Sequence, residues 1–163
     1  MEFDIRLNFK DMYRFNMYQM YSGFHGWFSV ILAVIVFVIG GVTCGEVETK
    51  RTILYVVFGI LFLIYPPLSL YFSAKRALAA SAVLQGTLHY LVDEAGFTVS
   101  QNGESANLPW DAIYKMVATK SNVLVYSNRT NAYVIPREQL GAQYKDLAKL
   151  ANENLAKYRV KMK

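Results

Sequence analysis

Cysteine and histidine are scarce in this chain. Its 163 residues include one cysteine, Cys44, and two histidines, His25 and His89. A single cysteine excludes an internal disulfide and a zinc site built from cysteines. Neither histidine has an acidic or cysteine partner at ligand spacing, and no serine, cysteine or lysine has a visible activating partner. We therefore expect no metal site, no cofactor and no catalytic site, and hence no enzyme activity.

Charged residues are absent from two long stretches of the first half, residues 15–45 and 52–74. Each stretch contains an apolar run, at 27–44 and at 52–72. A helix of eighteen residues is about 27 Å long, which is close to the thickness of the hydrocarbon core of a bilayer. The pattern therefore predicts two transmembrane helices, with the lipid bilayer as their first partner.

Two other interpretations of these runs are weaker. A pair of buried core helices would need more chain to surround them than the remaining residues provide. A cleavable signal peptide would begin close to the N-terminus. Here some twenty-six residues, including Glu2, Asp4 and Asp11, precede the first run.

The connection between the two runs, residues 45–51, is short enough to force the predicted helices antiparallel. Basic residues near the runs number five on the side of the termini and two in the connection. Because cytoplasmic segments carry the excess of Lys and Arg, both termini are expected in the cytoplasm. Pro66 and Pro67 lie inside the second run and lack an N–H, so we expect a kink there. The five basic residues are Arg6, Lys10, Arg14, Lys75 and Arg76, and the two are Lys50 and Arg51.

The net charge of +5 has a local origin. Residues 86–158 contain seven Lys or Arg and seven Asp or Glu, whereas the last five residues add three positive charges. This distribution gives no basic face, and we expect no nucleic-acid partner. The basic tail could contact anionic lipid headgroups, or it could be a solvated terminus. Its candidate membrane-contact residues are Lys157, Arg159, Lys161 and Lys163.

The segments that flank the apolar runs carry their own patterns. Apolar and polar residues alternate from Glu2 to Phe9, which predicts a half-buried strand paired to a sheet. Asn8 followed by Asp11 predicts the start of an amphipathic helix at the membrane surface, within an N-terminal segment of residues 1–26. After the hairpin at 27–74, the Ala-rich residues 75–85 predict a helical connector that stops at Gly86.

Residues 86–163 have the texture of a soluble β-rich domain. Short apolar runs predict strands at 87–92, 97–101, 106–119, from 123, and at 132–136, with turn residues between them. A stripe of apolar residues at spacings of three or four predicts one helix over 139–158. The sequence thus predicts an α+β membrane protein, in which a transmembrane helical hairpin carries a pleckstrin-homology-like (PH-like) antiparallel β domain closed by a C-terminal helix.

Several short motifs are similar to those of a known family. They are LNFKDMYRFNMY at 7–18, DEAGF at 93–97, LPWDAI at 108–113 and AYVIPRE at 132–138. With the hairpin between them, they resemble the YcxB-like family of bacterial membrane proteins. The resemblance implies a multi-pass protein of the bacterial inner membrane, and it implies no active site.

Three classes of function remain open from the sequence. The first is a membrane-tethered binding or scaffolding module, in which a groove between a strand and a helix of the β domain receives a segment of an unidentified protein. The second is an immunity-type protein that protects the membrane against a toxin. The third is a membrane enzyme or transporter, which would need a polar pocket that the sequence does not predict.

Overall fold

The structure is a computed structural model that describes residues 1–162, except for the side chain of His25. The chain divides into two compact units. One unit combines residues 1–15 with the chain from residue 76 onward, and the other comprises residues 16–75. Helix α1 (Phe9–Tyr21) and helix α3 (Thr49–Ala80) each contribute residues to both units. Each unit is described by itself below.

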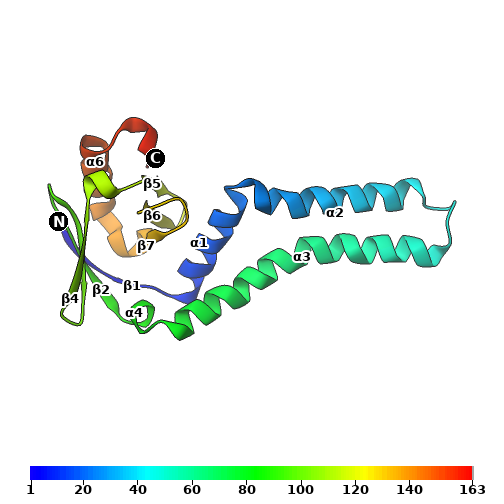
Figure 1. Cartoon of the computed structure of the whole chain (residues 1–163), viewed down its shortest axis with the longest axis horizontal. Coiled ribbons are helices and arrows are strands. Elements are labelled where there is room, and N and C mark those ends of the chain that lie inside the picture. Colours follow the sequence, from blue (N-terminus) through cyan, green and yellow to red (C-terminus); the bar gives the residue numbers. More distant parts are fainter. Residues whose placement is uncertain (163) are drawn as a thin grey trace. The chain divides into compact units, whose positions relative to one another are not determined.

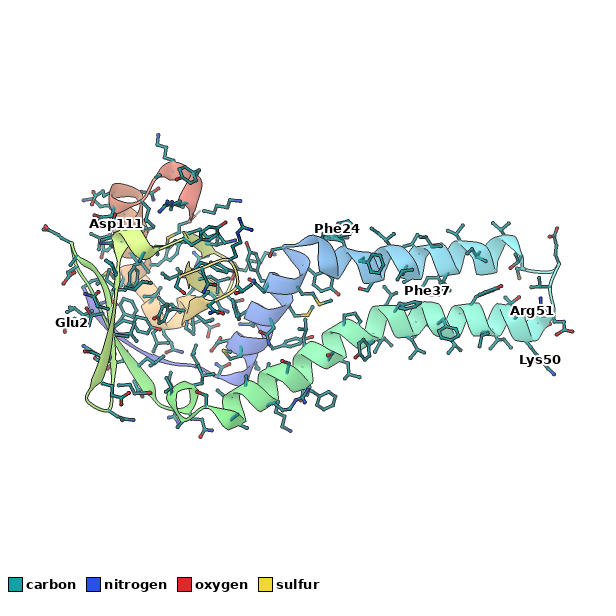
Figure 2. The ribbon with its side chains drawn as sticks, in the orientation of Figure 1. Glu2, Phe24, Phe37, Lys50, Arg51 and Asp111 are labelled. Atoms are coloured by element: carbon teal, nitrogen blue, oxygen red, sulfur yellow. The ribbon has the colours of Figure 1, made fainter. Side chains whose placement is uncertain are left out.

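The unit of residues 16–75 is helical (Figure 1). Its main elements are α2 (Phe24–Val42) and most of α3, connected by residues 43–48. The helices lie side by side, and Figure 2 shows Phe37 pointing from α2 toward α3. The Phe37 ring lies over Gly59, since a Cβ built at that glycine would be 2.5 Å from the ring. A Cβ built at Gly40 would likewise lie 3.0 Å from the Cβ of Tyr55.

Among the described helices, α3 is long and apolar enough to cross a membrane. Helix α1 and residues 26–42 of α2 meet at 69°, and together they would give a second such segment. The helix boundaries differ from those predicted. Helix α2 ends at Val42 and not at Cys44, and α3 extends beyond 52–72 at both ends and continues unbroken through Pro66 and Pro67.

The predicted connector is divided between two helices. Helix α3 continues to Ala80, and a short helix α4 (Ala82–Gln85) follows. Ser81 between them has an extended backbone, and its hydroxyl accepts a hydrogen bond from the Leu84 N–H (3.4 Å). Ser81 thus acts as an N-cap, which ends one helix and starts the next. As expected, the helix stops at Gly86.

The other unit contains two four-stranded sheets. In the first, the strand order is β1 (Glu2–Arg6), β2 (Thr87–Val92), β3 (Gly96–Gln101) and β4 (Glu104–Pro109), all antiparallel. The predicted N-terminal strand is confirmed. Phe3 pairs with Tyr90 and Ile5 with Leu88, so the alternating apolar residues of β1 enter the core.

The second sheet has the order β7 (Ala132–Pro136), β6 (Asn122–Tyr126), β5 (Lys115–Ala118) and β8 (Val160–Lys161). Strand β8 is parallel to β5, so the sheet is mixed, and the prediction of a wholly antiparallel β domain is wrong. The broader prediction of an α+β chain is confirmed.

The predicted long strand over 106–119 is interrupted. Strand β4 ends at Pro109, a 3₁₀ turn η1 (Trp110–Ala112) follows, and β5 starts in the other sheet. Pro109 has no N–H to continue a ladder. The Trp110 indole N–H donates to the Asp93 carbonyl (3.0 Å), and its ring meets Phe97 edge-on, which places Trp110 in the core.

The predicted helix over 139–158 is also interrupted. The chain forms α5 (Arg137–Leu140), a 3₁₀ turn η2 (Gly141–Gln143), α6 (Tyr144–Asn154) and a 3₁₀ turn η3 (Lys157–Arg159). Gly141 has φ of +52°, a conformation that favours glycine and ends α5. Four members of the predicted apolar stripe are buried, namely Leu140, Leu147, Ala151 and Leu155. Tyr144 is half-buried, and Tyr158 lies beyond α6 and is 76% exposed.

Candidate binding groove

A half-open groove of about 340 Å³ lies within the unit that contains the two sheets. Both sheets, the first turns of α1 and the short helix α4 contribute to its walls. Most of the lining is apolar. The lining residues are Leu7, Met12, Phe15, Val83, Leu84, Leu88, Tyr90, Val99, Ser100, Gln101, Glu104, Ser105, Ala106, Ala132, Tyr133 and Val134.

Helix α1 is held over the groove by two polar contacts at its start. The Asp11 N–H donates to Asn8 Oδ1 and the Asn8 N–H donates to Asp11 Oδ2, both at 3.1 Å. This reciprocal pair is a capping box, as predicted from the two residues. In addition, Asn122 Nδ2 on β6 donates to the Asp11 carbonyl (3.2 Å). These contacts fix the direction in which Met12 and Phe15 reach the groove.

Tyr90 forms part of the wall on the first sheet. Its ring stacks on Phe3 with the centroids 5.4 Å apart, and its side chain is 1% exposed. Burial raises the pKa of the Tyr90 hydroxyl, and the nearby Tyr133, also on the groove, raises it further. The phenol therefore stays protonated at neutral pH and can donate a hydrogen bond.

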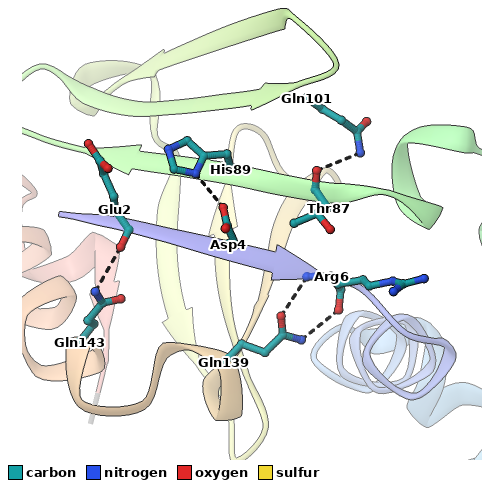
Figure 3. A network of polar contacts seen from close by, with 8 residues as sticks. All are labelled: Glu2, Asp4, Arg6, Thr87, His89, Gln101, Gln139 and Gln143. Carbon is teal, nitrogen blue, oxygen red and sulfur yellow. Dashed lines mark hydrogen bonds and ion pairs between the residues drawn. The ribbon is translucent and has the colours of Figure 1, made fainter.

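Apart from Tyr90 and Tyr133, the polar residues of the lining come from the β3–β4 hairpin. Gln101 is already used structurally, because its Nε2 donates to the carbonyls of Val83 (3.0 Å) and Thr87 (3.3 Å). Figure 3 shows the second of these contacts. Gln101 thereby joins the hairpin to α4 and shapes the wall. Glu104 is the one charged residue among those that line the groove.

Strand β7 is an edge strand of the second sheet, and its ladder with β6 shows which backbone groups are used. The Arg137 N–H donates to the Ser121 carbonyl (2.8 Å), and the Ser127 N–H donates to the Asn131 carbonyl (3.1 Å). In an antiparallel pair, such hydrogen-bonded residues alternate with residues whose N–H and C=O point away. The odd-numbered residues of β7 therefore face β6.

The even-numbered residues of β7 point their backbone groups outward. They are Ala132, Val134 and Pro136, and the last has no N–H. No strand other than β6 pairs with β7 in the part of the chain that the structure describes. Ala132 and Val134 both line the groove, so the groove is bordered by an unpaired strand edge.

The edge of β1, at the far side of the first sheet, is occupied instead. The Arg6 N–H donates to Gln139 Oε1 and Gln139 Nε2 donates to the Arg6 carbonyl, both at 2.9 Å. Gln143 Nε2 donates to the Glu2 carbonyl (3.1 Å). Figure 3 shows the two glutamine side chains beside β1. They take the place of a neighbouring strand, and edges covered in this way do not pair with other chains.

The structure places the basic tail away from the groove. Lys157 and Lys161 are exposed, while the partly buried Arg159 donates from Nη1 to the Ile113 carbonyl (3.3 Å) and lies beside the Tyr158 ring. Lys163 lies outside the described residues. Val160 pairs with Met116, so that Val160–Lys161 form strand β8. Contact of the tail with lipid headgroups and a solvated terminus both stay predictions.

Other residues considered from the sequence have structural surroundings. His89 contacts Asp4 at 2.7 Å on an exposed face of the first sheet (Figure 3). The Asp93 carboxylate accepts hydrogen bonds from Ala95 and Gly96 within its turn. Among the described residues, no group of three or more His, Cys, Asp and Glu is placed to hold a metal ion.

The groove itself was not located from the sequence, although one signal pointed to its border. Proline within a sheet is confined to edges, first positions and bulges. Pro136 at the end of AYVIP therefore marks β7 as an edge strand. The opposite walls could not be found in this way, because they come from segments about 120 residues apart in the chain.

Comparison with known proteins adds a family to this geometry. Residues 92–151 match the family model described as YcxB-like protein. This segment is similar to the YcxB-like family. The match confirms the resemblance seen in the motifs of the second half. No curated protein and no solved structure matches the chain.

The YcxB-like segment contains only part of the groove. It includes the lining residues of β3, β4 and β7, and also Gln139 and Gln143. The lining residues of β2, α1 and α4 lie outside it. The groove is therefore completed by the two stretches of chain that lead into and out of the helical unit.

Proposed function

We propose that this protein is a membrane-tethered binding module, in which the groove of the unit that contains the two sheets receives an extended segment of a partner protein. A two-pass helical hairpin formed by α2 and α3 holds the unit at the cytoplasmic face of the bacterial inner membrane. The unit serves as a PH-like platform. The single observation that carries the proposal is the unpaired outer edge of β7 along an apolar groove.

The apolar surface of the helical unit supports the membrane anchor. In the most apolar window of α3, 11% of the residues are buried, whereas a core helix of a soluble protein would be mostly buried. Large apolar side chains are exposed on both helices, including Phe24, Val42 and Tyr65 at 70% or more. Burial of these apolar side chains in a bilayer would be favourable, whereas their exposure to water would be unfavourable.

The anchor has a topology that can be measured. The five-to-two distribution of basic residues favours termini in the cytoplasm and residues 45–51 in the periplasm. Alkaline phosphatase is active only in the periplasm, so a fusion within 45–51 should be active and a fusion after Lys163 inactive. A fluorescent reporter that matures in the cytoplasm should give the reverse pattern. An active phosphatase at Lys163 would contradict the proposed topology.

Strand addition to β7 is favoured over addition to β4, the other edge that borders the groove. Val134 on β7 is 4% exposed and belongs to the packed core, so a strand beside it would extend an apolar surface. Residues 104–107 of β4 are exposed on both faces. Backbone hydrogen bonds to β7 would supply affinity, and the lining would select side chains.

The binding test uses the full chain in lipid nanodiscs and a displayed library of random ten-residue peptides. Enriched peptides should bind the wild type, and their affinity for the Ala132→Pro variant should be about tenfold lower, because this substitution removes one outward N–H from β7. The matched control is Ser105→Pro, which removes an outward N–H from β4. Failure to enrich any peptide, or equal binding to both variants and the wild type, would reject strand addition at β7. Loss with Ser105→Pro alone would move the site to β4.

A further inference from the structure

The Tyr90 hydroxyl has an unusual environment for a polar group. Its side chain is 1% exposed, and its pKa is raised by burial and by Tyr133, with no hydrogen bond contributing. The hydroxyl oxygen is not one of the fully buried side-chain atoms that lack a partner, since Asn122 Oδ1 is the one such atom among the described residues. Tyr90 lines a half-open groove, where water can bond its hydroxyl. A segment that displaces this water must supply a hydrogen-bond partner of its own, because a polar group that is covered without one is destabilising.

The protonated phenol limits what that partner can be. As a donor, it needs an oxygen or nitrogen acceptor on the bound segment. Among the described residues, no Lys, Arg or His lines the groove, so a carboxylate would enter the apolar lining without a compensating charge. A neutral acceptor such as a Ser, Thr, Asn or Gln side chain meets both conditions.

Glu104 restricts the charge that a bound segment can carry near the β3–β4 turn. It is the one charged residue of the lining, and it lies at the turn of the β3–β4 hairpin, where its side chain is exposed. A basic side chain on the segment would complement this charge at the solvent-exposed rim. An acidic side chain at the same place would be repelled.

We infer that the groove selects an extended segment with a neutral hydrogen-bonding side chain against Tyr90 and a Lys or Arg near Glu104. The inference rests on the proposed function, because it describes the partner of the same groove. Apolar side chains of the segment cover the remaining lining. A wholly apolar segment would cover Tyr90 without giving its hydroxyl a partner, and it would therefore bind less tightly.

The test is a double-mutant cycle on the full chain in nanodiscs. The probes are the peptides enriched from the ten-residue library, each made with Thr or with the isosteric Val at its polar position. The wild type should prefer Thr over Val by at least tenfold, and Tyr90→Phe should reduce this preference to about onefold. Tyr114→Phe, at an exposed tyrosine outside the groove, is the matched control and should keep the full preference.

The two proposals fail in different ways. Peptides that bind, and that respond to Ala132→Pro, but show equal affinity for Thr and Val would leave strand addition intact and overturn the role of Tyr90. Retention of the Thr preference in Tyr90→Phe would overturn it as well.

The charge is tested separately with Glu104→Gln, which should reduce the preference for Lys or Arg over Gln in the peptide at least threefold at low salt. An unchanged preference would overturn the role of Glu104. Absence of any binding peptide would overturn both proposals together.

Discussion

Asn122 and Asp11 are joined by a hydrogen bond from the side-chain amide of one to the backbone carbonyl of the other, across 111 residues of chain. The Asn122 side chain donates through Nδ2, while its Oδ1 is buried with no hydrogen-bond partner among the described residues. Asp11 is itself 4% exposed, and burial raises the pKa of its carboxyl. The start of α1 is thus fixed to β6 by two residues whose polar groups are incompletely compensated.

Replacement of Asp11 by Asn should stabilise the protein at neutral pH. The Asn side chain keeps an oxygen to accept the Asn8 N–H, and it removes a charge that burial disfavours. The matched control is Asp146→Asn, at an exposed position in the first turn of α6. Chemical unfolding of the full chain in detergent micelles measures the effect. A lower free energy of unfolding for Asp11→Asn at pH 7 would show that the carboxylate is compensated.

The same residue gives a pH dependence with a definite sign. The folded protein binds the Asp11 proton more tightly than the unfolded chain does, because the pKa is raised in the folded state from 3.8. The contribution of Asp11 to stability therefore increases as the pH falls from neutral through the folded pKa, and it levels off below 3.8. Asp11→Asn should remove this component, which appears as the difference between the pH profiles of the variant and the wild type.

Gln139→Ala and Gln143→Ala should destabilise the unit that contains the sheets. Together they remove three hydrogen bonds to β1, each with a net contribution of about 0.5–1.5 kcal/mol. The control is the pair Asn152→Ala and Asn154→Ala, whose amides donate to carbonyls of their own helix. Hydrogen exchange should show faster exchange of the Arg6 N–H in the glutamine variants and not in the controls. Unchanged exchange would mean that the glutamines are not needed to cover the edge.

Loss of the indole N–H of Trp110 should lower the stability of the protein. Trp110→Phe keeps the aromatic contact to Phe97 but leaves the Asp93 carbonyl without its donor, at a cost of about 1–2 kcal/mol. Trp27→Phe, at a position that is 56% exposed, is the control and should have little effect. Equal thermal stability of the two variants in micelles would show that water replaces the indole at Asp93.

The sequence was informative where the pattern of side chains alone determines an element. Alternation at 2–9 was sufficient to predict β1, because Phe3 and Ile5 can be buried only on one face of a strand. The capping box could likewise be predicted, since its two hydrogen bonds join Asn8 and Asp11, which are three residues apart.

Other features depended on distant contacts that no local pattern contains. Gln139 and Gln143 look like surface residues of a helix, and their role is visible only when β1 lies beside them. Tyr90 looks like any inward residue of a strand, and its place on the groove follows from the distant segments that surround it. The breaks at Pro109 and Gly141 had local signals, but the apolar periodicity on either side was continuous and obscured them.

The basic tail provides a last prediction, because its exposed and partly buried members should behave differently. Arg159 donates to the Ile113 carbonyl, so Arg159→Gln should lower stability with or without anionic lipid. Lys157 and Lys161 are exposed, and each should contribute about 1 kcal/mol to contact with an anionic membrane surface if the tail lies near it.

A polarity-sensitive dye on Met162→Cys, in a Cys44→Ser background, reports on that contact. Its emission should shift to the blue in nanodiscs with anionic lipid compared with neutral lipid, and salt that shortens the screening length below about 8 Å should reverse the shift. Lys157→Gln with Lys161→Gln should abolish the shift without changing stability. The same emission in both lipids for the unsubstituted tail would instead establish a solvated tail.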